Sequence, residues 1–228
     1  LRQADGRLLR SWRDGAGARY NAYLEDYAFL ADGLLALYQT TFEPRWFLWA
    51  RELAEWMLTH FEDPAGGFFD TSDDHEMLLH RPKDTQDNAT PSGNSMAAGV
   101  LLALSLYTGE GRYWDMAESM VAALAEPMMR YPGAFSHWLC AAALIMAEPR
   151  EVAIVGDPAA ADTRELLDVL ESRYRPSLVV AVGPGDTTAV PLLADRPQLD
   201  GRATAYVCRR LACLNPVTQP EALAEQLL

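Results

Sequence analysis

The sequence predicts a mainly α fold, in which stacked helical hairpins precede a small α/β segment. Apolar residues recur at steps of three and four along residues 20–38, which is the period of an α-helix. A helix–turn–helix pattern occurs twice at a constant offset, so that Leu35 in the first copy matches Leu102 in the second. After the last helix, two short apolar runs replace the helical period. These observations divide the chain into a helical part, residues 1–148, and an α/β tail, residues 149–228.

The helical part is expected to begin with an exposed lead-in or a short hairpin over residues 1–19, which are rich in arginine and glycine. Five helices follow, separated by proline or glycine breaks. Thr90 and Pro91 suit the start of the third helix, because threonine caps helices and proline fits the first helical position. The expected helices cover residues 20–38, 44–60, 91–107, 112–124 and 133–146.

A repeated hairpin that cannot bury its apolar face alone indicates stacked helices, arranged either as an open solenoid or as a closed toroid. Two copies are fewer than the roughly three repeats that such a stack needs for stability. The exposed faces of these hairpins are therefore expected to pack against upstream hairpins or against a partner.

The tail predicts a βαβ unit with two parallel strands. Residues 152–155 and 178–182 are apolar runs joined by a helical stretch, and a third strand is expected at residues 203–208. The loops after the first two runs, at residues 156–157 and 183–186, lie where open parallel sheets bind ligands. Neither loop matches a phosphate-binding pattern, so we favour a structural cap over a ligand site there.

Charge and composition exclude several classes of function. A formal net charge of −13 over 228 residues repels phosphate backbones, so nucleic acid is not an expected partner. No apolar run is long enough to predict a membrane span. The chain starts without a methionine or a signal-peptide pattern, which predicts a fragment of a longer protein.

The three cysteines predict neither a metal site nor a redox centre. Cys140 lies on an apolar helix, while Cys208 and Cys213 do not have the two-residue spacing of redox motifs. Because no second pair of ligands is near them, we expect no zinc, no other cofactor and no obligatory disulfide. So few cysteines indicate a reducing compartment, the cytoplasm.

Several blocks spread over the chain resemble one known family. They are residues 5–11, 25–29, 66–71, 81–84, 87–95, 154–158 and 203–208, with Cys213 and residues 216–218. On these residues the chain resembles the thioredoxin-domain-containing, spermatogenesis-associated (YyaL-like) family. The resemblance implies a long protein with an N-terminal thioredoxin-like domain, then a six-hairpin (α/α)6 toroid similar to glycosidases and sugar epimerases, then the βαβ tail. It implies no particular reaction, because a fold does not determine a function.

Polar residues concentrate between residues 66 and 98, in a long connection that ends at a helix start. Connections of this length are usually functional or disordered, and the aromatic residues here favour order. Sugar hydrolysis requires one acid and one base or nucleophile on opposite sides of the bond, which makes carboxylates the candidate catalytic groups. A solvated surface loop is the alternative explanation of these charges. The catalytic candidates are Asp26, Asp70, Asp73 and Asp87, with Asp74 and Glu76 as further carboxylates.

Neighbouring side chains are candidate substrate-binding groups. The resemblance implies epimerases that transfer protons with paired histidines, and His75 and His80 both lie in this connection. Arg81 and Lys83 either neutralise carboxylates of the connection or bind an anionic substrate group. The turn before the third helix either presents hydrogen-bonding groups or, through Gly93, allows two helices to approach closely. The binding candidates are His75, Arg81, Lys83, Asn88, Ser92 and Asn94.

These features predict a carbohydrate-processing or carbohydrate-binding domain with a sugar ligand, whether or not it is an enzyme. The alternative is a non-catalytic scaffold for a thioredoxin-like domain or a client protein. The repeat matches Asp26 to Gly93, so the connection is expected to bring Asp70, Asp73 or Asp87 within one sugar's reach of Asp26. If Asp26 instead caps a helix or pairs with an arginine and turns away from the connection, the scaffold replaces catalysis. Helical spacing favours core packing over sugar stacking for Trp46, Trp49, Trp56, Trp114 and Trp138.

Overall fold

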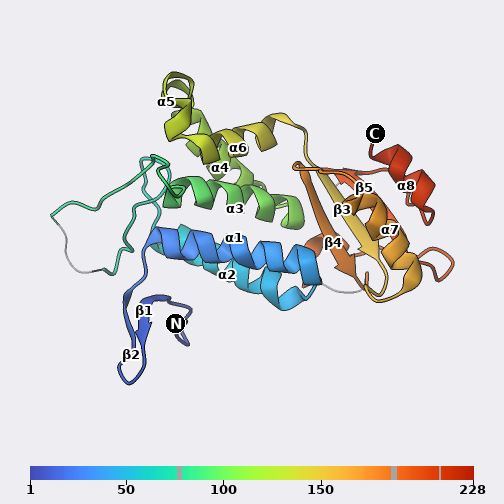
Figure 1. The fold of residues 1–228 in the computed structure, drawn as a ribbon, viewed down its shortest axis with the longest axis horizontal. Coiled ribbons are helices and arrows are strands. Elements are labelled where there is room, and N and C mark those ends of the chain that lie inside the picture. The colour runs from blue at the N-terminus through green and yellow to red at the C-terminus, as the bar shows by residue number, and fades with distance from the viewer. Residues whose placement is uncertain (76–78, 186–188, 211) are drawn as a thin grey trace.

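A bundle of helical hairpins and a small mixed sheet meet end to end in this protein (Figure 1). The computed structural model describes residues 1–75, 79–185, 189–210 and 212–228. The first hairpin is α1 (Leu24–Thr41) with α2 (Pro44–His60), and the second is α3 (Gly93–Thr108) with α4 (Gly111–Ala123). They are followed by α5 (Ala125–Arg130), the 3-10 turn η1 (Pro132–Ala134) and α6 (Ser136–Met146).

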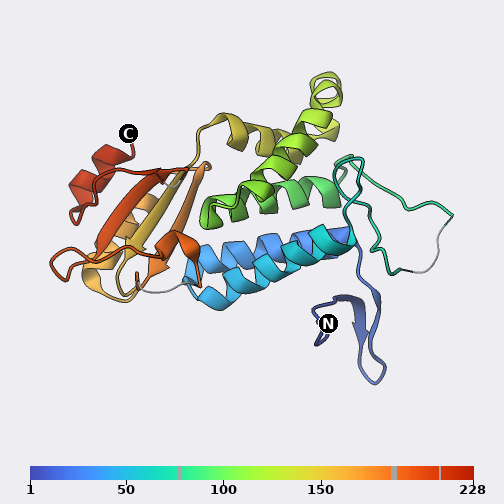
Figure 2. The ribbon, with the colours of Figure 1, turned by 180° about the vertical axis from the view of Figure 1, so that it is seen from behind.

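The two predicted helical hairpins are neighbours in the structure. α1 packs against α2 and α3, and α3 packs in turn against α4 and α6. Seen from behind, α2 lies in front of α1, so the bundle has two layers (Figure 2). α3 occupies the centre of the bundle, because nearly all of its residues are buried, including Leu102 of the repeat.

Local capping sets where the helices begin. α1 begins after Tyr23, whose backbone N–H donates a hydrogen bond of 2.8 Å to the Asp26 carboxylate. α3 begins after Ser92 and not after Thr90, because the Ser92 hydroxyl accepts a hydrogen bond from the backbone N–H of Ser95. A Cβ atom at Gly93 would lie only 3.0 Å from the backbone nitrogen of Glu25, so glycine lets α1 and α3 approach closely there.

The tail forms a four-stranded sheet with the order β4-β3-β5-β6. β3 (Arg150–Val155) pairs in parallel with β4 (Leu178–Gly183), and α7 (Ala161–Glu171) connects them, which confirms the predicted βαβ unit. β5 (Thr204–Arg209) is the expected third strand and runs antiparallel to β3, while β6 (Ala212–Cys213) runs antiparallel to β5. The 3-10 turn η2 (Pro191–Leu193) precedes β5, and α8 (Pro220–Gln226) follows β6.

The two faces of the sheet bury different partners. Val152 and Ile154 pack on one face with residues of α7 and α8, whereas the alternate residue Ala153 belongs to the core of the helical bundle. This alternation follows from the period of two in a β-strand. At the junction, the rings of Tyr38 and Tyr107 lie 5.5 Å apart, and the Tyr107 hydroxyl donates a hydrogen bond of 3.1 Å to the backbone oxygen of Val180 in β4.

The prediction of a mainly α fold is wrong. About 48% of the described residues are helical and 17% are in strands or bridges, so the fold is mixed α/β. In addition to the sheet of the tail, β1 (Leu9–Arg13) and β2 (Gly17–Asn21) form an antiparallel hairpin. The described residues do not show an (α/α)6 toroid. A small sheet packs against α1 and α3. Of the helices that the structure describes, none is long and apolar enough to cross a membrane.

The expectation of free thiols is also wrong, because Cys208 and Cys213 form a disulfide. The antiparallel register of β5 and β6 places the two residues directly opposite each other. Their spacing along the chain does not reveal this, since β6 is only two residues long. Cys140 on α6 is a free, exposed thiol.

We predict that Tyr107→Phe destabilises the junction of bundle and sheet, because it removes the hydroxyl that donates to the Val180 carbonyl. The expected loss is about 1–2 kcal/mol in the free energy of unfolding, measured by urea denaturation. Tyr131→Phe is the matched control, since Tyr131 is 55% exposed. Identical unfolding midpoints for the two variants would contradict the proposed role of Tyr107.

Candidate functional site

The connection predicted to hold the site joins α2 to α3 and lies at the end of the bundle away from the sheet (Figure 1). Backbone hydrogen bonds fix it against α1, since Leu24 N–H donates to the Asp70 carbonyl oxygen at 2.9 Å. Asp70 N–H in turn donates to the Pro82 carbonyl oxygen at 2.8 Å, and Phe68 is fully buried. The described residues of this connection are therefore integrated into the fold.

Asp87 is a buried carboxylate that holds two helix starts. Its Oδ1 atom accepts hydrogen bonds from Ser92 N–H at 2.9 Å and from the Ser95 hydroxyl at 2.7 Å. Its Oδ2 atom accepts a hydrogen bond of 2.8 Å from the backbone N–H of His137 in the first turn of α6. Both carboxylate oxygens are thus engaged within the protein.

Asn94 and Ser92, two predicted binding residues, also make internal contacts. The Asn94 side chain accepts from Phe68 N–H at 2.9 Å and donates to the carbonyl oxygens of Phe68 and Asp84 at 3.0 and 2.9 Å. Ser92 caps α3. These two side chains attach the connection to the start of α3.

Arg81 and Lys83 bind groups of the connection that carries them. Lys83 pairs with Asp63 at 3.1 Å and donates to the Gly66 carbonyl oxygen. Arg81 donates to the carbonyl oxygens of Thr71 and His60, and its guanidinium carbon lies 4.2 Å from the centroid of the Phe69 ring. Among the carboxylates of the connection that these cations could neutralise, Asp84 accepts a hydrogen bond of 3.0 Å from Gln86 N–H, and Asp87 holds the two helix starts described above.

The remaining catalytic candidates lie at the same end of the bundle. Asp26 caps α1 and pairs with Arg10 at 3.4 Å. The Asp73 carboxylate lies 2.9 Å from the Nδ1 atom of the His60 ring. Asp70 accepts hydrogen bonds from Asp84 N–H at 3.1 and 3.0 Å. Burial raises the pKa of Asp70, and the nearby carboxylates of Asp84 and Glu25 raise it further, against the hydrogen bond from Asp84 N–H.

Two binding candidates complete this set. The His75 ring stacks on Tyr23 with 5.7 Å between ring centroids, and Asn88 is exposed. Glu76 lies outside the described residues. The structure therefore gathers the predicted residues at one end of the bundle but engages most of their polar atoms internally. Their catalytic and binding roles stay predictions.

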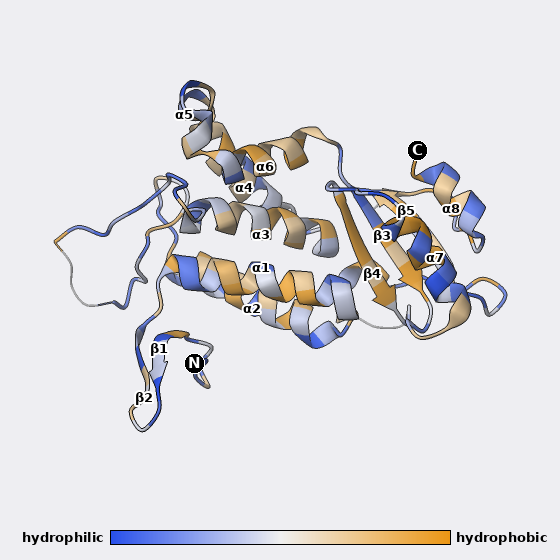
Figure 3. Ribbon diagram, in the orientation of Figure 1, coloured by the Kyte–Doolittle hydropathy of each residue, from blue (hydrophilic) through white to orange (hydrophobic). Residues whose placement is uncertain are grey.

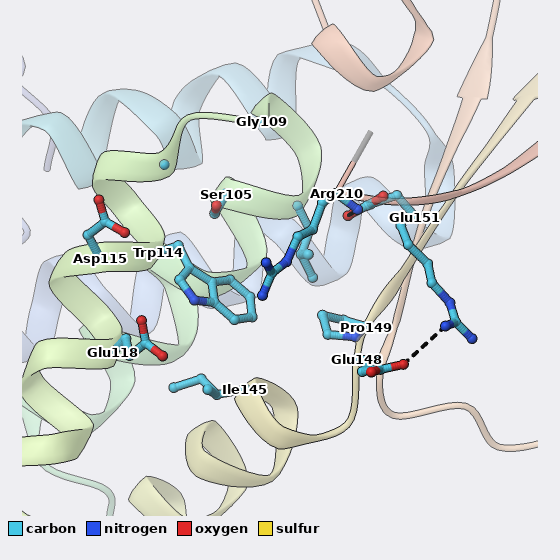
Figure 4. Close-up of a pocket in the computed structure, with 13 residues that line it drawn as sticks. Ser105, Gly109, Trp114, Asp115, Glu118, Ile145, Glu148, Pro149, Glu151 and Arg210 are labelled. Carbon is cyan, nitrogen blue, oxygen red and sulfur yellow. Dashed lines mark hydrogen bonds and ion pairs between the residues drawn. The ribbon is translucent and has the colours of Figure 1, made fainter. Parts of the chain in front are cut away.

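A cavity of about 670 Å³ lies elsewhere, where the bundle meets the sheet (Figure 4). It is bordered by the end of α3, the start of α4, the end of α6, the start of β3 and the end of β5. Trp114, Ile145 and Pro149 supply apolar wall surface. The charged wall residues are Asp115, Glu118, Glu148, Glu151, Arg209 and Arg210.

The two arginines of the cavity have different surroundings. Arg209 pairs with Glu148 at 3.0 Å. The Arg210 side chain extends toward the Trp114 indole (Figure 4). Glu151 is only 2% exposed, and its carboxylate accepts a hydrogen bond of 3.1 Å from the backbone N–H of Arg210. This buried carboxylate fixes the backbone from which Arg210 reaches the cavity.

Such a wall can recognise a ligand with several hydroxyl groups. Carboxylates accept hydrogen bonds from hydroxyls, and a guanidinium donates them. An indole ring offers a flat apolar face beside these polar groups. The arrangement is suited to binding, and the described contacts identify no pair of groups in it as an acid and a base.

These cavity residues are far apart in the sequence and were not predicted as a site, because they come from α4, β3 and the segment after β5. One signal was available in the repeat, where Trp114 matches Phe47. Phe47 is fully buried in the core, whereas Trp114 is only partly buried and lines the cavity. A larger aromatic residue at an incompletely buried position indicates surface available to a ligand.

A second hollow of about 750 Å³ lies at the carboxyl ends of β3 and β4, beside Gly156 and Asp157. The structural cap that we favoured for these loops stays a prediction. Asp186, expected at the same place, lies outside the described residues. Within the part of the chain that the structure describes, no group of three His, Cys, Asp or Glu residues could hold a metal ion.

The fold and the cavity of Figure 4 together define a mixed α/β protein in which a helical bundle and a small sheet meet at an open cavity with polar and apolar walls. No protein-family model matches the chain.

The chain is homologous to spermatogenesis-associated protein 20. It is 34% identical to this protein of Homo sapiens and to that of Mus musculus, in alignments 238 residues long that cover 98% of the chain. An uncharacterised protein of Caenorhabditis elegans is 25% identical over 230 residues, or 97% of the chain. The chain spans 30% of the length of the two mammalian relatives. The thioredoxin-like domain implied by the resemblance stays a prediction.

We predict that Asp87→Ala destabilises the fold strongly, because three buried donors at the starts of α3 and α6 lose their acceptor. The expected loss is roughly 2–4 kcal/mol in the free energy of unfolding, measured by chemical denaturation. Asp73→Ala is the matched control and should cost less than about 1 kcal/mol, since its contact with His60 is exposed. Unchanged stability of Asp87→Ala would argue against this structural role.

Proposed function

We propose that this chain binds a neutral, hydroxyl-rich ligand of mono- or disaccharide size in the cavity of Figure 4. One observation carries the proposal, namely that Trp114, several carboxylates and Arg210 line one cavity of about 670 Å³. Small-ligand sites typically occupy roughly 300–1,000 Å³ and combine apolar walls with a few polar groups. The proposal keeps the carbohydrate ligand expected from the sequence and changes its place on the molecule.

Binding is favoured over hydrolysis at the predicted catalytic residues. Asp87 accepts three internal hydrogen bonds, and Asp26 both caps α1 and pairs with Arg10. A carboxylate that acts on a sugar must be free to exchange a proton with it or to attack it. The structural contacts of Asp26 and Asp87 compete with such a role.

The charge of the cavity restricts the ligand. Asp115, Glu118, Glu148 and Glu151 place four carboxylates in the wall, against the two guanidinium groups of Arg209 and Arg210. The excess of negative charge repels phosphorylated or acidic sugars and tolerates neutral or amino sugars. Neutral sugars should therefore bind more tightly than the corresponding sugar phosphates.

We predict that Trp114→Ala weakens sugar binding at least about tenfold, which corresponds to about 1.4 kcal/mol. The loss of the indole face removes the apolar surface on which a sugar ring would lie. Isothermal titration calorimetry with a panel of neutral mono- and disaccharides, and with their phosphates, measures the effect. Trp49→Ala is the matched control, because Trp49 is 44% exposed on α2 and does not line the cavity.

Two results would contradict the proposal. One is the absence of heat and of thermal stabilisation with every sugar of the panel. The other is binding that Trp49→Ala and Trp114→Ala weaken equally, since this would place the sugar outside the cavity or indicate a general effect on the fold.

A scaffold function is the second candidate, favoured by apolar residues of α1 that are exposed to solvent. Figure 3 shows the apolar segments of this helix in orange. Phe29, Leu30 and Leu37 are 37%, 45% and 44% exposed on this helix. Their helical spacing gathers them on one side, where a protein partner could bury them. The scaffold is the better account if three results are obtained together. Sugar titrations give no heat, a separately produced thioredoxin-like domain binds this chain, and Leu37→Asp abolishes that binding.

A further inference from the structure

The disulfide between Cys208 and Cys213 joins one buried cysteine to one exposed cysteine. Cys208 lies in β5 and is 1% exposed, whereas Cys213 in β6 is exposed. Thiol–disulfide exchange proceeds by attack of a thiolate on one sulfur, so access decides which sulfur is attacked. An external thiolate would reach Cys213 and displace Cys208.

Arg196 lies beside both sulfur atoms. One of its terminal nitrogens lies 3.4 Å from the Cys213 sulfur and 3.8 Å from the Cys208 sulfur. The other terminal nitrogen donates a hydrogen bond of 3.1 Å to the Ala194 carbonyl oxygen, and the guanidinium carbon lies 5.8 Å from the centroid of the Tyr206 ring. The Nε atom of Arg196 is buried without a hydrogen-bond partner among the described residues.

A half-buried guanidinium beside a disulfide is not needed to hold the bond itself, because a disulfide carries no charge. It favours the reduced state, in which a neighbouring arginine stabilises a thiolate. The position of Arg196 thus suits a pair that is opened and closed, more than a permanent crosslink.

We propose that Cys208 and Cys213 are a redox-active pair that exchanges with an external dithiol, and that Arg196 stabilises the thiolate that leaves. This inference goes beyond the sugar-binding function and does not depend on it. The chemical partner is a small-molecule or protein dithiol.

The exchange proceeds in two balanced steps. A thiolate of the dithiol attacks the Cys213 sulfur, so that a mixed disulfide forms, the Cys208–Cys213 bond breaks, and Cys208 leaves as a thiolate beside Arg196. The second thiol of the dithiol then loses its proton and attacks the dithiol's first sulfur atom in the mixed disulfide, which releases the Cys213 thiolate. The partner becomes a disulfide, two electrons pass to the cysteine pair, and the protons of the partner's thiols pass to the two cysteines or to solvent.

Reduction of the disulfide is expected to affect the cavity of Figure 4. Arg209 and Arg210 directly follow Cys208, and both line that cavity. β6 pairs with β5 at Cys208 with Cys213 and at Arg209 with Ala212, and just past β6 the backbone N–H of Leu214 donates to the Val207 carbonyl oxygen. Reduction therefore removes the covalent link from the strand pair that carries one side of the cavity wall.

The test measures reduction of the full chain in a Cys140→Ser background, so that only the pair contributes thiols. Alkylation and mass spectrometry follow the rate of reduction by dithiothreitol, and ultraviolet absorbance follows thiolate formation in the reduced protein as the pH changes. We expect reduction without denaturant and thiolate formation below the ordinary cysteine pKa of about 8.5. Arg196→Gln should slow reduction by roughly tenfold and move thiolate formation to higher pH, while Arg196→Lys should restore most of both.

Arg130→Gln is the matched control, because Arg130 is an exposed arginine of α5, remote in the chain from the pair, and should change neither quantity. Circular dichroism establishes that each variant is folded. The proposal is overturned if the pair resists dithiothreitol until the protein is unfolded, or if thiol labelling finds both cysteines free in air-oxidised protein. Reduction rates and thiolate titrations that are identical in the wild type and in Arg196→Gln would also overturn it. None of these measurements uses a sugar, so failure here is distinct from failure of the proposed function.

Discussion

The buried carboxylate of Asp87 is the interaction on which the arrangement of the helices depends. It accepts hydrogen bonds from Ser92 and Ser95 at the start of α3 and from His137 at the start of α6. The first turn of a helix leaves backbone N–H groups without partners and carries partial positive charge, so one carboxylate satisfies two helix starts together. Because α3 forms the centre of the bundle, this contact orients the helices whose far ends border the cavity.

The polar residues of this protein fall into two groups with different roles. Those at the connection between α2 and α3, such as Lys83 within it and Asn94 at the start of α3, hydrogen bond to the connection and attach it to the bundle. Those near the sheet, such as Glu118 and Arg210, line a cavity beside the Trp114 ring. The first group builds one end of the bundle, and the second lines the cavity at the opposite end of the bundle, where it meets the sheet, which we propose as the ligand surface.

Sequence patterns predicted the elements better than their assembly. The hairpins were predictable because each carries its own apolar stripe, and the βαβ unit because its strands are continuous apolar runs. For residues 1–19 the sequence left an exposed lead-in and a short hairpin both open, because most residues of Leu9–Arg13 are exposed and show no alternation, and the structure forms the hairpin. The contact of Asp87 with His137 could not be predicted, and neither could the contact of Glu151 with Arg210 in the cavity wall, because both form only through tertiary packing. Capping of α1 by Asp26 lacks the usual serine or threonine signal, since the capping residue is Tyr23.

The central claim is that the junction of bundle and sheet, and not the charged connection, is where this chain meets a ligand. The most direct measurement is a crystal structure of the chain soaked with the sugar that gives the largest heat of binding. The account predicts electron density for one sugar ring against the Trp114 indole, with hydroxyl groups near Glu118 and Arg210. Density beside Asp26, Asp70 and Asp87, with the cavity left unoccupied by sugar, would contradict it.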